Sequence, residues 1–306
     1  MKISRIAVAS AIAIVATVPA GAQDRSVYSN RVDSTVTIER GGTVSVSVYS
    51  GRVNVTGGSG SQVQIRGTTE RSDLEIRARP TSVTISTDPE GSHRGRAELD
   101  IVVPIGTRVV FDGFSTPFSI KGVKGEAKIE TLSGSAVVTD AVGKVSVETV
   151  SGNIDIGNVE GDVRAEAVSG RIEITSVQGD IDTETVSSRI TITGAKSNTV
   201  RAESVGGSLI YDGTFDQTGS YTFKTHSGRL TLGMPANTGA TVSLETFSGS
   251  VDSDFPVTML SAGNRGEGRE ARFEFKIGDG RARVVAETFS GDIRIMRGTT
   301  SQSRDQ

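Results

Sequence analysis

Acidic side chains recur at one position of a short repeated phrase. A glutamate stands three residues before the serine or glycine of most of the repeated turns. Several carboxylates in a row could hold cations such as Ca²⁺, which prefers oxygen ligands. A solvated outer face explains the same row, because Lys128, Arg164 and Arg201 lie two positions earlier and partly neutralise it. We favour this second interpretation. The row consists of Glu130, Glu148, Glu166, Glu184, Glu203, Glu245 and Glu287.

A pair of carboxylates could also hydrolyse glycosides. Asp155 and Glu173 occupy equal positions in successive repeats, so stacking of the repeats would place their Cα atoms ~5 Å apart. That separation suits a retaining pair. Any acidic repeat gives the same geometry, however, and neither unusual residues nor long loops interrupt the repeats between 115 and 200. We therefore predict that the protein is not an enzyme and has no catalytic residues.

Other reactive side chains are scarce. The chain has no cysteine, which excludes thiolate chemistry and a disulfide framework. Its 2 histidines are His93, in a charged loop, and His226, beside a turn where equivalent repeats carry Val150 and Val168. A His-Ser neighbour pair is not a catalytic triad, because adjacent strand residues point to opposite faces. We expect surface histidines, no zinc site, no other metal site and no cofactor.

These side chains depend on a repeat for their positions. The serines of the Ser-Gly turns recur at one constant step from Ser115 to Ser187, and the later steps are slightly longer. The final step, from Ser248 to Ser290, is twice the one before it, which predicts a repeat without its signature near Gly268-Arg269. The turn residues are Ser115, Ser133, Ser151, Ser169, Ser187, Gly206, Ser227, Ser248 and Ser290.

Within each repeat the apolar residues alternate with period two, which is typical of strands. Each repeat therefore predicts two short strands joined at a Ser-Gly turn. The constant step favours a β-solenoid with coils of about 18–21 residues stacked in register, and a sandwich of hairpins is the alternative. Large aromatics are nearly absent from the predicted interior, with Phe247 and Phe289 as exceptions. The predicted interior columns are Ile154, Ile172, Ile190 and Val145, Val163, Ile181.

The first residues resemble a secretory signal peptide. Lys2 and Arg5 precede an apolar run of about fourteen residues, and Ala20-Gly21-Ala22 supplies an A-x-A cleavage site. The run is too short to span a bilayer, and no later run has spanning length. We predict a signal peptide over 1–22 and an exported protein, either periplasmic or at the cell surface or secreted, without an integral membrane segment in the mature chain.

The rest of the chain divides by its pattern. Residues 23–112 carry longer alternating segments and predict an N-terminal β region that caps the rod. Residues 113–297 hold the solenoid repeats, and the polar tail 298–306 is predicted to be disordered. Without Lys2 and Arg5 the 33 basic residues fall to 31 against 36 acidic ones, a formal charge of −5. This charge argues against nucleic acid as a partner.

The repeats resemble a known family. The units "GDVRAEAVSGRIEI" and "GKVSVETVSGNIDI", preceded by "LDIVVPIGTRVVFDGFS", are similar to those of DUF4097, a family of exported bacterial β-repeat proteins regarded as candidate adhesins. The resemblance spans roughly 44–295. It implies kinship with adhesin heads that form a right-handed parallel β-helix. The family has no established catalytic residues, so none is implied here.

Together these observations favour a non-enzymatic exported protein with an adhesin-like binding or envelope-structuring role. Its partner would be an envelope or surface component, either a protein or a glycan. The alternative is a carbohydrate-active β-helix enzyme, a polysaccharide hydrolase or lyase. A third interpretation is a self-assembling scaffold similar to bactofilins, although these are cytoplasmic and the predicted signal peptide disfavours it.

Overall fold

The computed structural model describes residues 29–70, 74–87, 95–235, 238–256, 261–262 and 271–298. Every helix or strand element in these ranges is a β-strand, and all belong to one sheet, so the predicted all-β class is confirmed. The described part has no helix long and apolar enough to cross a membrane. The strands are β1 (Ser29–Thr37), β2 (Thr43–Gly58), β3 (Gln62–Glu70), β4 (Glu75–Arg79), β5 (Ser82–Ser86), β6 (Arg96–Pro104), β7 (Arg108–Ser115), β8 (Phe118–Lys121), β9 (Ala127–Thr131), β10 (Ala136–Val142), β11 (Val145–Thr149), β12 (Ile154–Glu160), β13 (Val163–Ala167), β14 (Ile172–Gln178), β15 (Ile181–Thr185), β16 (Ile190–Ser204), β17 (Leu209–Thr225), β18 (Leu230–Met234), β19 (Ala240–Thr246), β20 (Val251–Ser253), β21 (Ser261–Ala262), β22 (Ala271–Ile277), β23 (Ala282–Thr288) and β24 (Ile293–Arg297).

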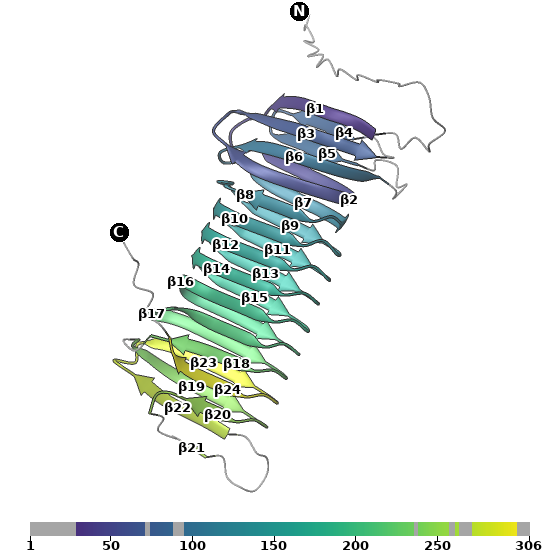
Figure 1. The fold of residues 1–306 in the computed structure, drawn as a ribbon. Coiled ribbons are helices and arrows are strands. Elements are labelled where there is room, and N and C mark those ends of the chain that lie inside the picture. The colour runs from purple at the N-terminus through teal and green to yellow at the C-terminus, as the bar shows by residue number, and fades with distance from the viewer. Residues whose placement is uncertain are drawn as a thin grey trace, which may run out of the picture.

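The middle of the chain forms a rod of stacked coils (Figure 1). Strands before the Ser-Gly turns make one row, in which β9, β11, β13 and β15 pair in parallel. Strands after the turns make a second row, which contains β8, β10, β12 and β14. We call these the pre-turn row and the post-turn row. Each strand pairs with its equivalent in the next coil, so the β-solenoid is confirmed and the hairpin alternative is wrong.

The interior of the rod is filled by the predicted aliphatic columns. Ile154 pairs with Ile172, which in turn pairs with Ile190, and all three are fully buried. In the pre-turn row the column of Val145, Val163 and Ile181 is likewise buried. β-Branched side chains suit this narrow space because they pack closely between neighbouring strands. Burial and parallel backbone pairing therefore hold the rod together.

The post-turn strands bend at a column of left-handed residues. Asp140, Asn158 and Ser176 have φ angles of 56°, 53° and 55°, and Gly194 takes the equivalent place with 64°. Asn and Asp tolerate this conformation better than most residues, since their short side chains can hydrogen-bond locally. Asn158 Nδ2 donates to Asp140 Oδ1 at 2.7 Å. Beyond the bend Val159 is buried, so the bend returns the chain to the core.

Most of the turns carry glycine after the serine, and there neighbouring coils approach closely, whereas Thr116 and Ser188 take this place in two other coils. A Cβ at Gly152 would lie 1.9 Å from the carbonyl oxygen of Gly134. The Gly152 N–H donates to Thr149 Oγ1 at 3.0 Å, which satisfies a buried backbone donor. The next coil has alanine in place of this threonine, and there the Gly170 N–H donates to Ser188 Oγ at 2.5 Å. The inward hydroxyls therefore complete the turns.

At the N-terminal end one coil is inserted out of chain order. The first half of β2 pairs in parallel with β5 and β7, and its second half pairs with β6 and β8. The coil of residues 43–58 therefore lies between the coils of 82–104 and 108–121. Antiparallel pairs β4–β5, β3–β6 and β1–β3 lie at this end of the rod (Figure 1). The division at residues 112 and 113 stays a prediction.

The C-terminal end has a similar insertion. β23 pairs with β17 and β19, and β24 pairs with β18 and β20, all in parallel. The coil of 282–297 therefore lies between those of 220–234 and 240–253, and β22 covers β19 in antiparallel fashion. The Ser290 N–H donates to the His226 carbonyl. The lost repeat predicted between Ser248 and Ser290 falls around Gly268-Arg269, outside the described ranges, and the described strand β22 in this step pairs with β19 in antiparallel fashion and is not a parallel coil.

Several predictions concern residues outside the described ranges. They are the signal peptide over 1–22, the loop that carries His93 and the tail after residue 298, and all three remain predictions from the sequence. Gly268-Arg269 also lies outside the described ranges.

Candidate functional site

The repeated glutamates form a column on the outer face of the pre-turn row. Lys224 interrupts the column, and beyond it Glu287 precedes Glu245, because the coil of 282–297 is inserted between its neighbours. We call this set, with Lys224 at its place, the glutamate column. In order along the rod it consists of Glu130, Glu148, Glu166, Glu184, Glu203, Lys224, Glu287 and Glu245.

Basic side chains two residues earlier pair with the carboxylates, as predicted. The hydrogen bond from Lys128 to Glu130 raises the pKa of Lys128 above its ordinary value. Among the described residues, no group of three or more His, Cys, Asp or Glu side chains is arranged to hold a metal ion. The ion pairs supply counter-charges along this exposed face. The ion pairs are Lys128–Glu130, Arg164–Glu166 and Arg201–Glu203.

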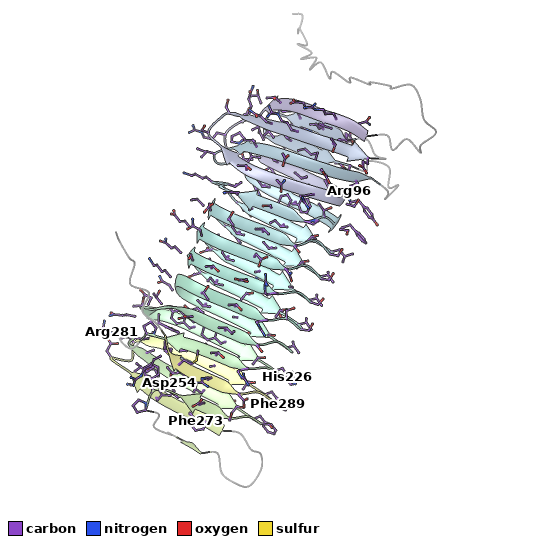
Figure 2. The ribbon with its side chains drawn as sticks, viewed as in Figure 1. Arg96, His226, Asp254, Phe273, Arg281 and Phe289 are labelled. Atoms are coloured by element: carbon purple, nitrogen blue, oxygen red, sulfur yellow. The ribbon has the colours of Figure 1, made fainter. Side chains whose placement is uncertain are left out.

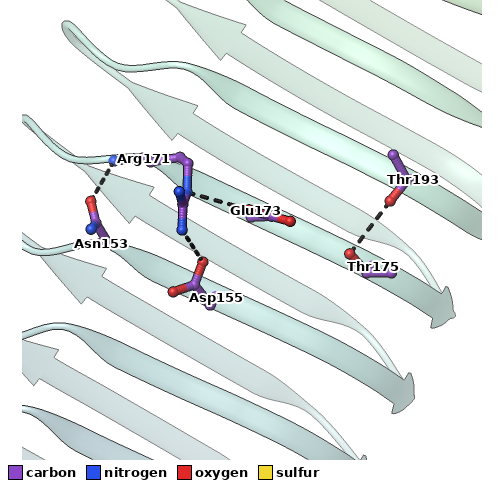
Figure 3. A network of polar contacts seen from close by, with 6 residues as sticks. All are labelled: Asn153, Asp155, Arg171, Glu173, Thr175 and Thr193. Atoms are coloured by element: carbon purple, nitrogen blue, oxygen red, sulfur yellow. Dashed lines mark hydrogen bonds and ion pairs between the residues drawn. The ribbon is translucent and has the colours of Figure 1, made fainter.

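The carboxylates considered for glycoside hydrolysis share one guanidinium (Figure 3). Asp155 and Glu173 lie opposite each other on adjacent coils, as the repeat predicts. Arg171 Nη2 lies 3.0 Å from Asp155 Oδ1, and its Nε lies 3.3 Å from Glu173 Oε2. The hydrogen bond to Asp155 raises the pKa of Arg171 further above its ordinary value. A retaining mechanism needs one carboxylate free to attack the sugar, and this cation engages both.

A second column, which the sequence pattern left unpredicted, consists of the residues directly before the turns. Phe247 and Phe289 were expected in the interior, but both are exposed, by 42% and 49%. The aliphatic members are exposed by 39% to 53%. Turn amides bond from coil to coil, as from Ser151 N–H to the Leu132 carbonyl at 2.9 Å, which fixes the alignment. The turn column is Phe114, Leu132, Val150, Val168, Val186, Val205, His226, Phe289 and Phe247.

Stacked rings mark both ends of the turn column. The ring of Tyr49 stacks on that of Phe114, with centroids 4.7 Å apart and planes within 8°. At the other end Phe289 lies between His226 and Phe247, with centroid distances of 4.8 and 4.9 Å and planes within 4°. Figure 2 labels His226 and Phe289 at this end of the rod. The faces of Phe289 are therefore covered.

His226 takes the place that valine occupies in the central coils. It is exposed, so the predicted surface position is confirmed. The adjacent Ser227 hydroxyl donates to the Val205 carbonyl at 3.4 Å. That bond belongs to the turn, and the His-Ser pair forms no catalytic arrangement.

The surface is hollowed along the two columns. One hollow of about 600 Å³ follows the coils from Asp112 to Val186, and a second of about 530 Å³ continues to Phe289. Glu184 and Thr185 belong to the lining of both hollows, so the two hollows form one continuous groove. We call it the groove. All charged residues that line the first hollow are carboxylates, and the second hollow adds Lys224 to them.

Comparisons with known proteins gave two similar structures and one matching family model. A structure from Clostridium sporogenes, described as a candidate cell adhesion protein, covers 87% of this chain and 99% of its own at 12% identity, with a TM-score of 0.27. A candidate adhesin from Bacteroides fragilis covers 87% and 97% at 9% identity, with a TM-score of 0.39. No curated protein gives a significant match. The Toastrack DUF4097 family model matches residues 9–296, and the chain therefore belongs to this family.

Proposed function

We propose that the protein is an exported, non-enzymatic binding protein whose groove holds a component of the cell envelope or surface. The turn column carries this proposal. Exposed apolar side chains that lie side by side on successive coils are costly to leave in water, and contiguous patches of this kind mark binding sites. The glutamate column runs beside them and gives the groove an acidic side. Such a surface suits adhesin-like attachment or a structural role in the envelope.

The acidic groove also limits the choice of partners. Nucleic acid and anionic lipid would be repelled by the carboxylates, because both bind through neutralisation of their own negative charge. Protein and glycan partners remain compatible with it.

A matched pair of substitutions tests the groove. Val150 and Val168 lie in the turn column, whereas Val142 is an exposed valine at the far end of a post-turn strand. The double change Val150→Ser, Val168→Ser should weaken binding of labelled protein to envelopes from cells that lack it by about tenfold. Val142→Ser should leave binding within about twofold. Equal binding by the parent and the double variant would contradict the proposal.

Export is tested separately. Protease would be added to intact cells and to cells with their outer barrier opened. Cleavage on intact cells indicates a surface protein, and protection until opening indicates the periplasm. Recovery of an uncleaved precursor from the cytoplasmic fraction would contradict export.

The enzyme alternative has its own readout. Incubation with cell-wall and capsular polysaccharides should yield no new reducing ends and no unsaturated products. Either product, if lost in Asp155→Asn, would replace the binding proposal with a hydrolase or lyase.

A further inference from the structure

The charge distribution of the groove favours a basic partner. Lys128, Arg164 and Arg201 pair with carboxylates of the glutamate column from two residues earlier on their strands, on the side away from the turn column, and Lys224 pairs with Glu287 within the column. They do not line the hollow beside the central coils, whereas Asp112, Glu130 and Glu148 do. Within the described residues no ion pair is formed by Glu148 or Glu184. A partner that brings cations to this side adds close contacts to the longer-range attraction of Lys128 to Glu148 and of Arg201 to Glu184.

The apolar side of the groove favours aliphatic or aromatic side chains over sugars and bare cations. Val150, Val168 and Val186 present methyl groups, which pack against other apolar side chains. In the aromatic part, both faces of Phe289 are covered by its neighbours. A cation needs an open ring face, and a sugar ring packs on the same electron-rich face. Ring edges and methyl groups together form an apolar ridge.

The spacing of the columns favours a helix over an extended peptide. Neighbouring coils lie ~4.8 Å apart, and an α-helix advances ~5.4 Å per turn. Over three coils the two repeats drift by only ~2 Å, which flexible side chains can absorb. Residues on one face of an extended strand repeat every ~6.7 Å, a mismatch of ~2 Å at every coil. A helix can therefore present one apolar residue and one basic residue per turn to successive coils.

We infer that the groove binds an amphipathic polypeptide helix whose apolar stripe packs on the turn column and whose adjacent lysines or arginines meet the glutamate column. This inference rests on the proposed binding function and specifies its partner. The docking corresponds to the helix-in-groove mode, with anchors at i, i+3, i+4 and i+7. Between Phe114 and Val186 the four coil steps span ~19 Å, which about thirteen helical residues would cover.

A synthetic peptide tests this inference with the full mature chain. The probe is a fluorescent peptide of about 18 residues with leucine at the anchor positions and lysine beside them. We expect saturable binding by anisotropy at physiological salt, together with a gain of helical circular dichroism. The double change Val150→Ser, Val168→Ser should weaken binding by about tenfold. Val142→Ser should leave it unchanged.

Charge variants provide a second test of the inferred helix binding. Glu148→Gln with Glu184→Gln removes carboxylates that have no ion pair among the described residues, so the fold should persist. Binding should weaken severalfold, and most strongly at low salt. Glu160→Gln, at an exposed position of the post-turn row, is the matched control and should bind like the parent.

The outcomes separate this inference from the proposed function. Equal binding of a scrambled peptide, or of one with a central proline that prevents helix formation, would overturn the helix. Tighter groove-dependent binding of a cationic amino-sugar oligomer would overturn it in favour of a glycan. In both cases loss of envelope binding in the valine double variant would still support the groove.

Discussion

The central coils follow one another in chain order, whereas each end of the rod contains a coil inserted between two others. In the centre, a strand finds its partners in the preceding and the following repeat, as Ile172 does with Ile154 and Ile190. At the C-terminal end β23 lies between β17 and β19, and at the N-terminal end β2 separates β5 from β7.

This difference reflects how strand edges are paired in the two parts of the rod. A central coil is covered on both sides by its neighbours in sequence, so repetition of one short phrase is sufficient. An end coil would expose unpaired strand edges, which invite aggregation. At the C-terminal end the chain therefore folds back so that one coil lies between two others. The antiparallel strand β22 then pairs with the outer edge of β19. Closing these longer loops costs entropy, which the additional pairing offsets.

Deletion of a central coil and deletion of the inserted coil should differ most in their effect on stability. Removal of 145–162, one central coil, leaves Val163 to stack where Val145 did, so a shorter rod should still unfold cooperatively. A chain that ends at Ile277 lacks the inserted coil and its buried residues Val284 and Ile293. Each of these buried side chains contributes roughly 1.5–3 kcal/mol, so their joint loss of roughly 3–6 kcal/mol reaches the lower end of the ~5–15 kcal/mol by which domains are stable. Hydrogen exchange should show loss of amide protection over 209–253.

Retained protection in the truncated chain would mean that β19 can pair directly with β17. The inserted coil would then be dispensable, and the contrast between centre and ends would fail. Unfolding of the central deletion would contradict the independence of the central coils.

Within one central coil, position should decide the cost of a charge. Ile172 is fully buried, and Ile172→Asp should destabilise the protein by several kcal/mol because the carboxylate has no partner inside the rod. Val168, four residues earlier, is 47% exposed, and Val168→Asp should change stability by roughly 0.5 kcal/mol or less. Urea denaturation followed by circular dichroism measures both. Similar midpoints for the two variants would contradict the assignment of inside and outside.

Close stacking in the centre predicts a smaller loss. Gly152→Ala would place its Cβ 1.9 Å from the Gly134 carbonyl oxygen, so a neighbouring coil must shift at a cost of roughly 1–3 kcal/mol. At Gly157 the nearest atom, Thr139 Cγ2, would be 4.0 Å away, and alanine there should be neutral or slightly stabilising. Thermal melts of the two variants provide the comparison, and equal melting temperatures would exclude coil contact as the reason for the turn glycine.

The local features of the centre could be predicted from the sequence. Period-two alternation and the constant step between turns were enough to predict the coils, the buried columns and the outward glutamates, because neighbouring residues determine all of them. The inserted coil could not be predicted, because Ser290 carries the same turn signature as every other coil. The turn column was missed because an apolar residue before a turn, such as Phe247, resembles a core residue. Only the turn geometry directs it outward.

The smallest effect concerns the contact between the inserted coil and the last one. Ser250 donates to Asp292 Oδ1 through its hydroxyl at 2.7 Å and its backbone N–H at 3.1 Å, and these bonds lower the pKa of Asp292. Because the folded-state pKa is lowered, the carboxylate stabilises the fold above its ordinary pKa of about 3.9, and this contribution is lost as pH falls through the folded value. Asp292→Asn should slightly lower the melting temperature at pH 7.

The difference between Asp292→Asn and the parent should shrink below about pH 4. Ser250→Ala should have a similar effect, and the double variant should be little worse than either single one, because both remove the same bonds. A difference that stays constant from pH 7 to pH 3 would show that the ionised carboxylate makes no contribution.

The inserted coil also determines how the rod bears mechanical load. If the last strand in sequence were also the outermost coil, tension on it would peel the rod apart one strand pair at a time. Here β24 lies between β18 and β20, so a pull on the chain beyond Arg297 must shear the hydrogen bonds on both sides together. Resistance to such pulling depends on the unfolding barrier rather than on equilibrium stability. The insertion thus distributes a pulling force over the hydrogen bonds to two neighbouring coils.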